Sequence, residues 1–407
     1  MSLANNIEFL RRLPKLNDLK GLGSLPQGGA RSSRLIETVG FGTNPGDLKM
    51  FSYLPGDQRA RQKLPLVVVL HGCTQTAAGY DTGAGWSTLA ARYGFALLMP
   101  EQKPSNNANT CFNWFNPEDV SRGSGEALSI RQMIARMARE HSIDGKRIFI
   151  TGLSAGGAMT SVMLATYPEV FAGGAIIAGL PFGVASNVQQ ALNGMFQPPT
   201  RPARELGDLV RNASKHKGPW PRLSVWHGSA DKTVNPANAS EIVKQWLDVH
   251  ALPQAPMSQS TVDGYPRAVW WNDDGETLVE SYTITDMAHG TPLGIADNDE
   301  RYGAQGAFMI EAGISSSYHI ASFFGLTGRV HQPGEASKPV AAAAMPTTIT
   351  VPPPAVFPPQ PAPEINPIPW PVAVSPGYAR PHRSLRRPAI DVGAVITRAL
   401  TAAGLMK

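Results

Sequence analysis

The sequence of 407 residues lacks the features that mark several special classes of protein. It has no window of about 18 uninterrupted apolar residues, which argues against a transmembrane helix. Charges are scattered through the N-terminal stretch instead of preceding an apolar core, so we find no signal peptide of the usual kind. The net charge is only +5, and aromatic residues are not interleaved with lysine and arginine. These observations argue against nucleic acid as a partner.

Cysteine is nearly absent. The two cysteines, Cys73 and Cys111, are too few for a disulfide scaffold and lack the spacing of zinc ligands, so we expect no metal centre. Each follows an apolar run that is typical of a buried strand, and neighbouring strands would bring both loops to one edge of a sheet. A disulfide there would require an oxidising compartment, whereas two free thiols are the alternative.

Proline is unevenly distributed along the chain. Many of the 36 prolines lie between Pro333 and Pro388, where the Pro/Ala content is typical of an extended linker that forms no packed core. After this stretch, apolar residues again recur at helical spacing. We therefore predict an N-terminal extension at residues 1–30, a folded domain at residues 31–330, a linker at residues 331–388 and an amphipathic helix at residues 389–407.

Short apolar runs alternate with longer helical patterns in the predicted domain. Such alternation indicates an α/β fold with a mostly parallel sheet covered by helices on both faces. The predicted strands are residues 66–70, 95–99, 147–151, 175–178, 223–226 and, as the last strand, 281–285. The predicted helices are residues 86–93, 126–141, 155–167 and 239–249. We expect residues 49–53 to form an antiparallel edge strand.

The strongest local signal is the segment Gly152-Leu153-Ser154-Ala155-Gly156, which follows an apolar strand and opens a helix. This is the context of the nucleophile elbow in the α/β-hydrolase fold. Glycine on both sides of the serine avoids the collision that a Cβ would cause in so tight a turn. The alternative is a chance glycine-rich turn. The pattern predicts that Ser154 is a nucleophile with an exposed hydroxyl.

A serine hydroxyl needs a histidine to take its proton and a carboxylate to orient that histidine. In this fold the chain order is nucleophile, acid, histidine. Asp231 follows the strand at 223–226 and His289 follows the strand at 281–285, so both are expected at the carboxyl edge of the sheet. Asp286 competes for the acid role, but its position three residues before the histidine suits a local cap. Of the nine histidines, we select His289 for its order and loop context.

Negative charge that develops on the carbonyl oxygen requires backbone donors that are in place before the reaction. We expect one from the N–H of Ala155 and another from the N–H of Cys73, in the loop after residues 66–70. His71 is expected to order this loop. His227 also follows a strand, and we interpret it as structural.

These segments together resemble the poly(3-hydroxybutyrate) depolymerase family of esterases, which are related to feruloyl and acetylxylan esterases. The matching stretches lie between about residues 35 and 325 and include LVVVLHGCTQTAAGY, IFITGLSAGGAMTSVMLATYPEVFAGGAIIAGLPFG and WHGSADKTVNP. The resemblance implies that Ser154, Asp231 and His289 form the triad. It also implies that Cys73 and Ala155 provide the oxyanion contacts and that Cys73 pairs with Cys111.

The resemblance places residues 111–115 beside the active site, where Trp114 would line the substrate cleft. A packed core aromatic is an equally good interpretation of Trp114.

The implied reaction is acyl transfer to water without a metal or organic cofactor. The substrates expected first are short-chain hydroxyalkanoate esters or their polymer, poly(3-hydroxybutyrate). Feruloyl or acetylxylan-type esters on polysaccharide come second, and a serine peptidase third. A non-catalytic binding module with the hydrolase fold is the alternative from another class. The resemblance and the expected disulfide favour an extracellular or cell-envelope location, with the cytoplasm as the alternative.

Overall fold

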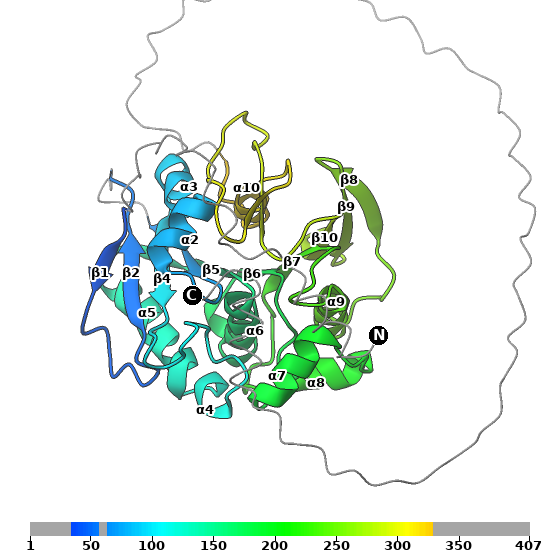
Figure 1. Ribbon diagram of the computed structural model, residues 1–407, viewed down its shortest axis with the longest axis horizontal. Helices are drawn as coiled ribbons and strands as arrows, with labels where there is room; N and C mark the ends of the chain where they lie inside the picture. The colour runs from blue at the N-terminus through cyan, green and yellow to red at the C-terminus, as the bar shows by residue number, and fades with distance from the viewer. Residues whose placement is uncertain (1–33, 57–62, 329–407) are drawn as a thin grey trace, which may run out of the picture. The chain divides into compact units, whose positions relative to one another are not determined.

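The computed structural model describes residues 34–56 and 63–328, which belong to one unit (Figure 1). The predicted extension at residues 1–30, linker at residues 331–388 and terminal helix at residues 389–407 lie outside the described residues. None of the helices in the described ranges is long and apolar enough to cross a membrane.

A ten-stranded sheet lies at the centre of the unit, in the order β1-β2-β4-β3-β5-β6-β7-β10-β9-β8. Its strands are β1 (Ile36–Thr38), β2 (Lys49–Tyr53), β3 (Leu64–Leu70), β4 (Ala96–Glu101), β5 (Ile143–Leu153), β6 (Gly173–Ile177), β7 (Arg222–Gly228), β8 (Ser258–Val262), β9 (Tyr265–Trp271) and β10 (Thr277–Ile284). The six strands from β4 to β10 in this order are parallel. Both margins of the sheet are antiparallel. A separate parallel pair comprises β11 (Thr291–Leu293) and β12 (Met309–Glu311).

The helices cover both faces of the sheet (Figure 1). They are α2 (Ala77–Ala84), α3 (Trp86–Tyr93), α4 (Pro117–Val120), α5 (Gly125–Glu140), α6 (Ala155–Thr166), α7 (Val188–Phe196), α8 (Ala203–Asn212), α9 (Ala237–Val249) and α10 (Ser316–Phe323), with a 3-10 turn η2 (Pro168–Val170).

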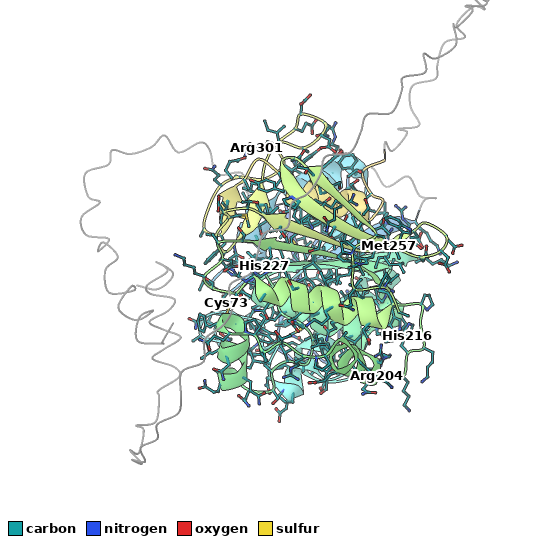
Figure 2. The ribbon with its side chains drawn as sticks, turned by 90° about the vertical axis from the view of Figure 1, so that its right-hand side faces the viewer. Cys73, Arg204, His216, His227, Met257 and Arg301 are labelled. Atoms are coloured by element: carbon teal, nitrogen blue, oxygen red, sulfur yellow. A yellow bond between two sulfur atoms is a disulfide. The ribbon has the colours of Figure 1, made fainter. Side chains whose placement is uncertain are left out.

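Alternating side chains of the strands divide the core into two layers. On β3, Leu66, Val68 and Leu70 pack with residues of α5, α6, α8 and α9. Val67 and Val69 face the other way and pack with residues of α2, α3 and α10. Successive residues of a strand point to opposite faces, so an uninterrupted apolar run fills both layers. Side chains fill the space between the sheet and its helices (Figure 2).

The predicted α/β-hydrolase architecture is confirmed, but two predictions at the margins of the sheet are wrong. The strand at residues 49–53 pairs antiparallel with β4 as expected, yet β1 lies outside it, so β2 is not the edge. The strand β10 is not the last one along the chain, since β11 and β12 follow it in a separate pair, and β9 and β8, which precede it in the sequence, extend the large sheet beyond it. β8 has the sequence SQSTV and is mostly exposed, so no apolar run marks it.

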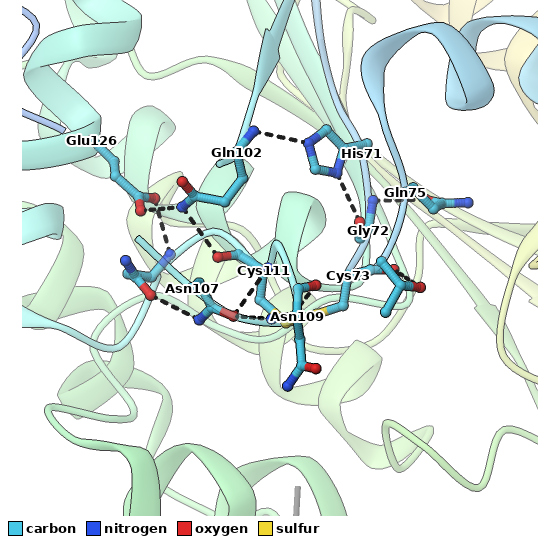
Figure 3. The surroundings of a disulfide bond; sticks show 11 residues. His71, Gly72, Cys73, Gln75, Gln102, Asn107, Asn109, Cys111 and Glu126 are labelled. Carbon is cyan, nitrogen blue, oxygen red and sulfur yellow. Dashed lines mark hydrogen bonds between the residues drawn. A yellow bond between two sulfur atoms is a disulfide. The ribbon is translucent and has the colours of Figure 1, made fainter. Parts of the chain in front are cut away.

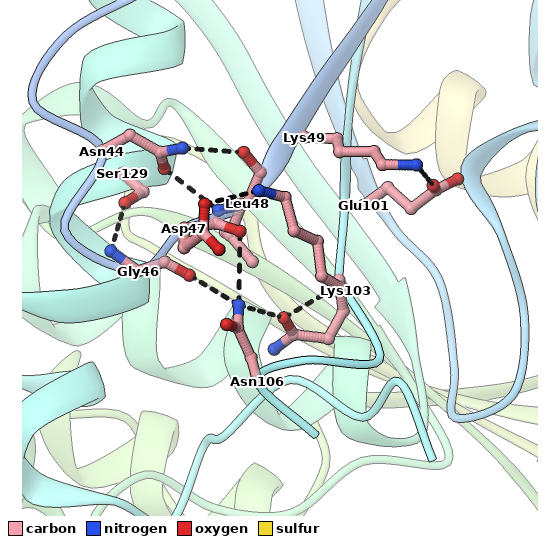
Figure 4. Close-up of polar contacts among 10 residues, drawn as sticks. Asn44, Gly46, Asp47, Leu48, Lys49, Glu101, Lys103, Asn106 and Ser129 are labelled. Atoms are coloured by element: carbon pink, nitrogen blue, oxygen red, sulfur yellow. Dashed lines mark hydrogen bonds and ion pairs between the residues drawn. The ribbon is translucent and has the colours of Figure 1, made fainter. Parts of the chain in front are cut away.

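Hydrogen bonds fix the turn before β2 against α5 and the loop after β4 (Figure 4). The N–H of Gly46 donates to Ser129 Oγ (2.8 Å), and Asn106 Nδ2 donates to the carbonyl of Gly46 (2.9 Å). A Cβ on residue 46 would lie 2.5 Å from Glu126 Cα, so only glycine fits this approach. The start of the loop that carries Cys111 is therefore held in place.

Candidate active site

Ser154 occupies the turn between β5 and α6. Its φ of 57° and ψ of −117° are unusual for a residue with a side chain, and strain of this kind costs about 1–3 kcal/mol. Ser154 is the N-cap residue of α6, but its side chain makes no capping hydrogen bond. Its hydroxyl is thus not committed to the helix.

The glycines around Ser154 allow a close contact between the elbow and the end of β3. A Cβ on Gly152 would lie 2.4 Å from the carbonyl oxygen of Gly156. A Cβ on Gly156 would lie 2.4 Å from the carbonyl oxygen of Leu70. The loop that follows Leu70 therefore starts directly beside the elbow.

His289 contacts Asp231 through a hydrogen bond of 2.7 Å between Nδ1 and Oδ2. The two side chains are nearly buried, with exposed fractions of 8% and 0%. They come from the loops after β10 and β7, which are neighbouring parallel strands. Because β5 lies in the same parallel array, Ser154 and this pair are all at the carboxyl edge of the sheet.

Backbone contacts join the loop that carries Asp231 to the loop that carries His289. The N–H of Ser229 donates to the carbonyl of Ile284 (2.9 Å), and the N–H of Ala230 donates to the carbonyl of Met287 (3.0 Å). A Cβ on Gly228 would lie 2.2 Å from the carbonyl oxygen of Met287. The two backbones thus lie too close at this point for a residue larger than glycine.

Asp286, the other candidate for the acid of the triad, makes a different contact. Its backbone N–H donates to Ser229 Oγ (2.9 Å), and its φ is 58°. Among the described carboxylates, the one that bonds to His289 is Asp231.

The carboxylate of Asp231 accepts hydrogen bonds on both oxygens. Oδ1 accepts from the backbone N–H of Thr233 (2.8 Å) and of Val234 (2.9 Å). Oδ2 faces His289 and also Nε2 of His227, at 3.2 Å. Burial alone would raise the pKa of Asp231, but the hydrogen bonds from His227 and His289 outweigh it and hold the pKa well below its usual range. Asp231 is therefore ionised at neutral pH.

The contact between His227 and Asp231 was not predicted from the sequence. In the sequence, His227 and Asp231 are four residues apart across a loop that contains glycine. This spacing does not predict a contact between the two side chains unless the path of the loop is known. The sequence context predicts only a structural role for His227.

The loop after β3 is tied to the loop after β4 by the Cys73–Cys111 disulfide (Figure 3). The N–H of Thr74 also donates to the carbonyl of Asn109 (2.7 Å). The alternative of two free thiols therefore does not apply to this structure.

His71 fixes the peptide group that precedes the N–H of Cys73. Its Nε2 accepts from the N–H of Gln102 (3.1 Å), so the proton lies on Nδ1, which donates to the carbonyl of Gly72 (2.7 Å). Complete burial lowers the pKa of His71, which favours this neutral ring. Since the peptide bond is planar, a fixed Gly72 carbonyl also fixes the direction of the Cys73 N–H.

Glu126, which no sequence pattern singles out, bonds to the loop that carries Cys111. Gln102 Nε2 donates both to Glu126 Oε1 and to the carbonyl of Cys111 (3.2 Å), and the N–H of Asn113 donates to Glu126 Oε2 (2.9 Å) (Figure 3). Burial, helped by the negative charge of Asp119, raises the pKa of Glu126 to about 8. A carboxyl group with a raised pKa is thus buried against the loop that carries Cys111.

Trp114 lies in the core layer of α5 and α6, with 8% of its surface exposed. Its ring packs edge-on against Phe115, with centroids 5.5 Å apart. The packed-core interpretation describes most of this side chain, and a substrate contact through its exposed part stays a prediction.

One group in the described ranges has the composition of a metal site. Ligand atoms of Asp263, Asp297 and His319 lie within 4.8 Å of one another. Two of them already pair, since His319 Nε2 and Asp263 Oδ2 are 2.8 Å apart. None of the three belongs to the pair of Asp231 and His289.

The fold and this edge of the sheet define a class of protein, the serine hydrolases with the α/β-hydrolase fold. The Esterase PHB depolymerase family model matches residues 48–262, and the chain belongs to this family. The protein is therefore a carboxylic ester hydrolase, as predicted.

Individual relatives agree with this class. Poly(3-hydroxyalkanoate) depolymerase C of Paucimonas lemoignei is 47% identical over 295 residues, which cover 72% of this chain and 70% of the relative. The acetylxylan esterase of Coprinopsis cinerea is 33% identical, covering 64% and 70%. Among solved structures, the acetyl xylan esterase from Aspergillus awamori matches with a TM-score of 0.57 and 26% identity, covering 63% of this chain and 93% of that one.

Proposed function

We propose that Ser154 attacks the ester carbonyl while His289 accepts its proton and Asp231 orients the imidazole. The observation that carries the proposal is the 2.7 Å bond between Asp231 and His289 at the same sheet edge as the strained turn of Ser154. Because Nδ1–H donates to Asp231, Nε2 is left as the base. The alcohol leaves with the proton held by His289, and water then releases the acid from the acyl-enzyme by the same route.

Two backbone groups would bind the oxyanion. The N–H of Ala155 is the first of α6, so it has no acceptor within the helix. The N–H of Cys73 belongs to the peptide whose carbonyl is held by His71. Donors that are fixed before the reaction need no reorganisation as charge develops.

The first substrate class is short-chain hydroxyalkanoate esters, with poly(3-hydroxybutyrate) as the polymer. The relative at 47% identity, named as a poly(3-hydroxyalkanoate) depolymerase, supports this choice. Acetyl or feruloyl esters on polysaccharide are the second class, supported by the likeness to acetylxylan esterases in sequence and in structure.

The disulfide supports a location outside the cell or in the cell envelope. The Cys73–Cys111 bond ties two loops beside the elbow, and disulfides persist in oxidising compartments.

The test measures hydrolysis of p-nitrophenyl acetate, butyrate and octanoate, together with clearing of a polyhydroxybutyrate suspension and acetate release from acetylated xylan. Ser154→Ala should lower kcat on the soluble esters by at least about 10⁴-fold, as expected for a triad member. Ser161→Ala is the matched control on the same helix, since Ser161 Oγ donates to the carbonyl of Leu180 (2.7 Å). It should stay near the wild-type rate.

Each outcome selects one function. A short-acyl preference with Ser154-dependent clearing would support the depolymerase. Acetate release from xylan without clearing would select the polysaccharide esterase. If Ser154→Ala left every ester activity unchanged, the proposed mechanism would be wrong.

A further inference from the structure

His227 is a second histidine on the carboxylate of Asp231. It is the penultimate residue of β7 and only 3% exposed, so it does not reach substrate. Its Nε2 lies 2.9 Å from the carbonyl oxygen of Val234 and 3.2 Å from Asp231 Oδ2. One ring nitrogen therefore faces two acceptors.

This geometry determines where the ring carries its proton. A carbonyl oxygen can only accept, so Nε2 of His227 must be the N–H that faces Val234. Nδ1 is buried and has no hydrogen-bond partner in the described part of the chain. The opposite tautomer would set two lone pairs against each other at 2.9 Å and bury an unpaired N–H as well. The tautomer of His227 with the proton on Nε2 is thus favoured by the surroundings of both ring nitrogens.

Val234 links His227 to the carboxylate of Asp231 through two hydrogen bonds. Val234 donates its N–H to Asp231 Oδ1 and accepts from His227 through its carbonyl. The backbone N–H groups of Thr233 and Val234 and the ring of His289 thus bond to the carboxylate. The N–H of His227, which bonds to Val234, is also 3.2 Å from Oδ2 and is a fourth, shared contact. A carboxylate held in this way has no freedom to turn away from His289.

We propose that His227 is a positioning residue for ester hydrolysis, which holds Asp231 Oδ2 in line with His289 through its own Nε2–H. The inference rests on the roles of Asp231 and His289 proposed above. His227 takes no proton from the substrate and acts only through Asp231.

Loss of the His227 donor has a specific electrostatic consequence. The titratable groups that act on Asp231 are His227 and His289. Without His227, the carboxylate has one donor fewer and becomes more basic, so its bond to His289 strengthens and favours the imidazolium. The acid limb of the pH profile of kcat/KM, which reports that imidazolium in the free enzyme, then moves to higher pH.

The experiment compares His227→Phe with His227→Gln on p-nitrophenyl butyrate from pH 5 to 9. Phenylalanine keeps the volume without a donor, whereas the glutamine amide can place an N–H near the Nε2 position. We expect His227→Phe to lower kcat by about 10²-fold, as a misplaced catalytic group does. KM should not change, and the acid limb should move up. His227→Gln should recover most of the rate and the wild-type limb.

His250→Phe is the matched control. His250 is a buried histidine whose Nε2 bonds to the carbonyl of Pro221 (3.1 Å), and its ring packs near Trp246 (5.9 Å). This substitution should lower the unfolding temperature without moving the acid limb. A limb that moves as far in His250→Phe as in His227→Phe would overturn the inference.

Two further results would also overturn the inference. One is an unchanged pH profile of kcat/KM in His227→Phe. The other is an equal loss of kcat in His227→Phe and His227→Gln with the acid limb unmoved, which would mean that the ring contributes packing alone. If His227→Phe does not fold, nitrogen-15 NMR of the wild-type histidines decides, since a bare Nε2 on His227 contradicts the inference. Ser154→Ala in the same assay separates the failures. An active Ser154→Ala refutes the proposed function, whereas an inactive one beside a normal His227→Phe refutes only the role of His227.

Discussion

Asp231 and Glu126 are both buried carboxyl groups, but their surroundings drive their pKa values in opposite directions. Asp231 receives hydrogen bonds from two histidines, which outweigh its burial and keep it charged. Glu126 accepts hydrogen bonds from one amide side chain and one backbone N–H, but its burial, helped by the like charge of Asp119, outweighs them and raises its pKa to about 8. At this scale the balance between burial and the hydrogen bonds and charges of the partners decides whether a buried carboxyl group is ionised.

Asp231→Asn should lower kcat on p-nitrophenyl butyrate by about 10⁴-fold, because an amide can stabilise the wrong tautomer of His289. The matched control is Asp286→Asn, since the contact that Asp286 makes to Ser229 comes from its backbone N–H. The control should remain near the wild-type rate. A larger loss in Asp286→Asn than in Asp231→Asn would reverse the assignment of the acid.

Glu126 predicts a pH dependence of stability. Its pKa is about 8 in the folded state against an ordinary value of 4.5, so the folded state binds the proton more tightly. The resulting stabilisation is complete below about pH 4.5 and is lost as the pH rises towards 8, by on the order of a few kcal/mol. Urea unfolding should show this decline in the wild type and not in Glu126→Gln. Parallel curves for the two proteins would contradict it.

At the scale of elements, the site depends on the contact between the ends of β7 and β10. Asp231 and His289 stand on loops whose backbones meet at Gly228 and Met287. Neighbouring parallel strands end at the same edge of the sheet, so the loops after β7 and β10 lie next to each other. The hydrogen bonds from Ser229 and Ala230 then set their separation.

Gly228→Ala should separate these loops, because the new Cβ would lie 2.2 Å from the carbonyl oxygen of Met287. We expect kcat to fall by about 10²-fold through displacement of His289, and stability to fall by about 1–3 kcal/mol. Gly145→Ala is the control, since a Cβ there would meet nothing within 4 Å. Wild-type activity in Gly228→Ala would show that the loops can adjust without cost.

At the scale of the whole molecule, one covalent bond joins two segments of the catalytic unit. Cys73 and Cys111 are 38 residues apart, and a loop of that length corresponds to about 4 kcal/mol in the chain-entropy model. Since Cys73 also lies in the proposed oxyanion loop, the bond connects stability with activity.

Reduction of the disulfide should lower the melting temperature by roughly 8 °C and should lower kcat because the loop loses one of its ties. Calorimetry and ester hydrolysis with and without dithiothreitol measure both effects. The double variant Cys73→Ser and Cys111→Ser keeps the backbone N–H and should not respond to reductant. A wild-type enzyme with the same melting temperature and rate under reduction would contradict the prediction.

The sequence alone was sufficient for the parallel core of the sheet, because strands buried on both faces are continuous apolar runs. The elbow at Ser154 was equally visible, since the steric demands of a tight turn act over five residues and leave a glycine pattern. The marginal strands β1, β8 and β9 were missed because strands exposed along one side carry no such run. Features that depend on local steric requirements can therefore be predicted from the sequence.

The sequence determined a serine hydrolase fold and a short set of candidate acids and histidines, because the order of these residues and their positions after predicted strands can be read without a structure. Tertiary structure decided which of them meet: Asp231 and not Asp286 bonds to His289, across 58 residues of sequence. It also decided the place of His227 on the same carboxylate and the protonation of Glu126. These depend on distances of about 3 Å between atoms from different loops, and such distances exist only once the layers have packed.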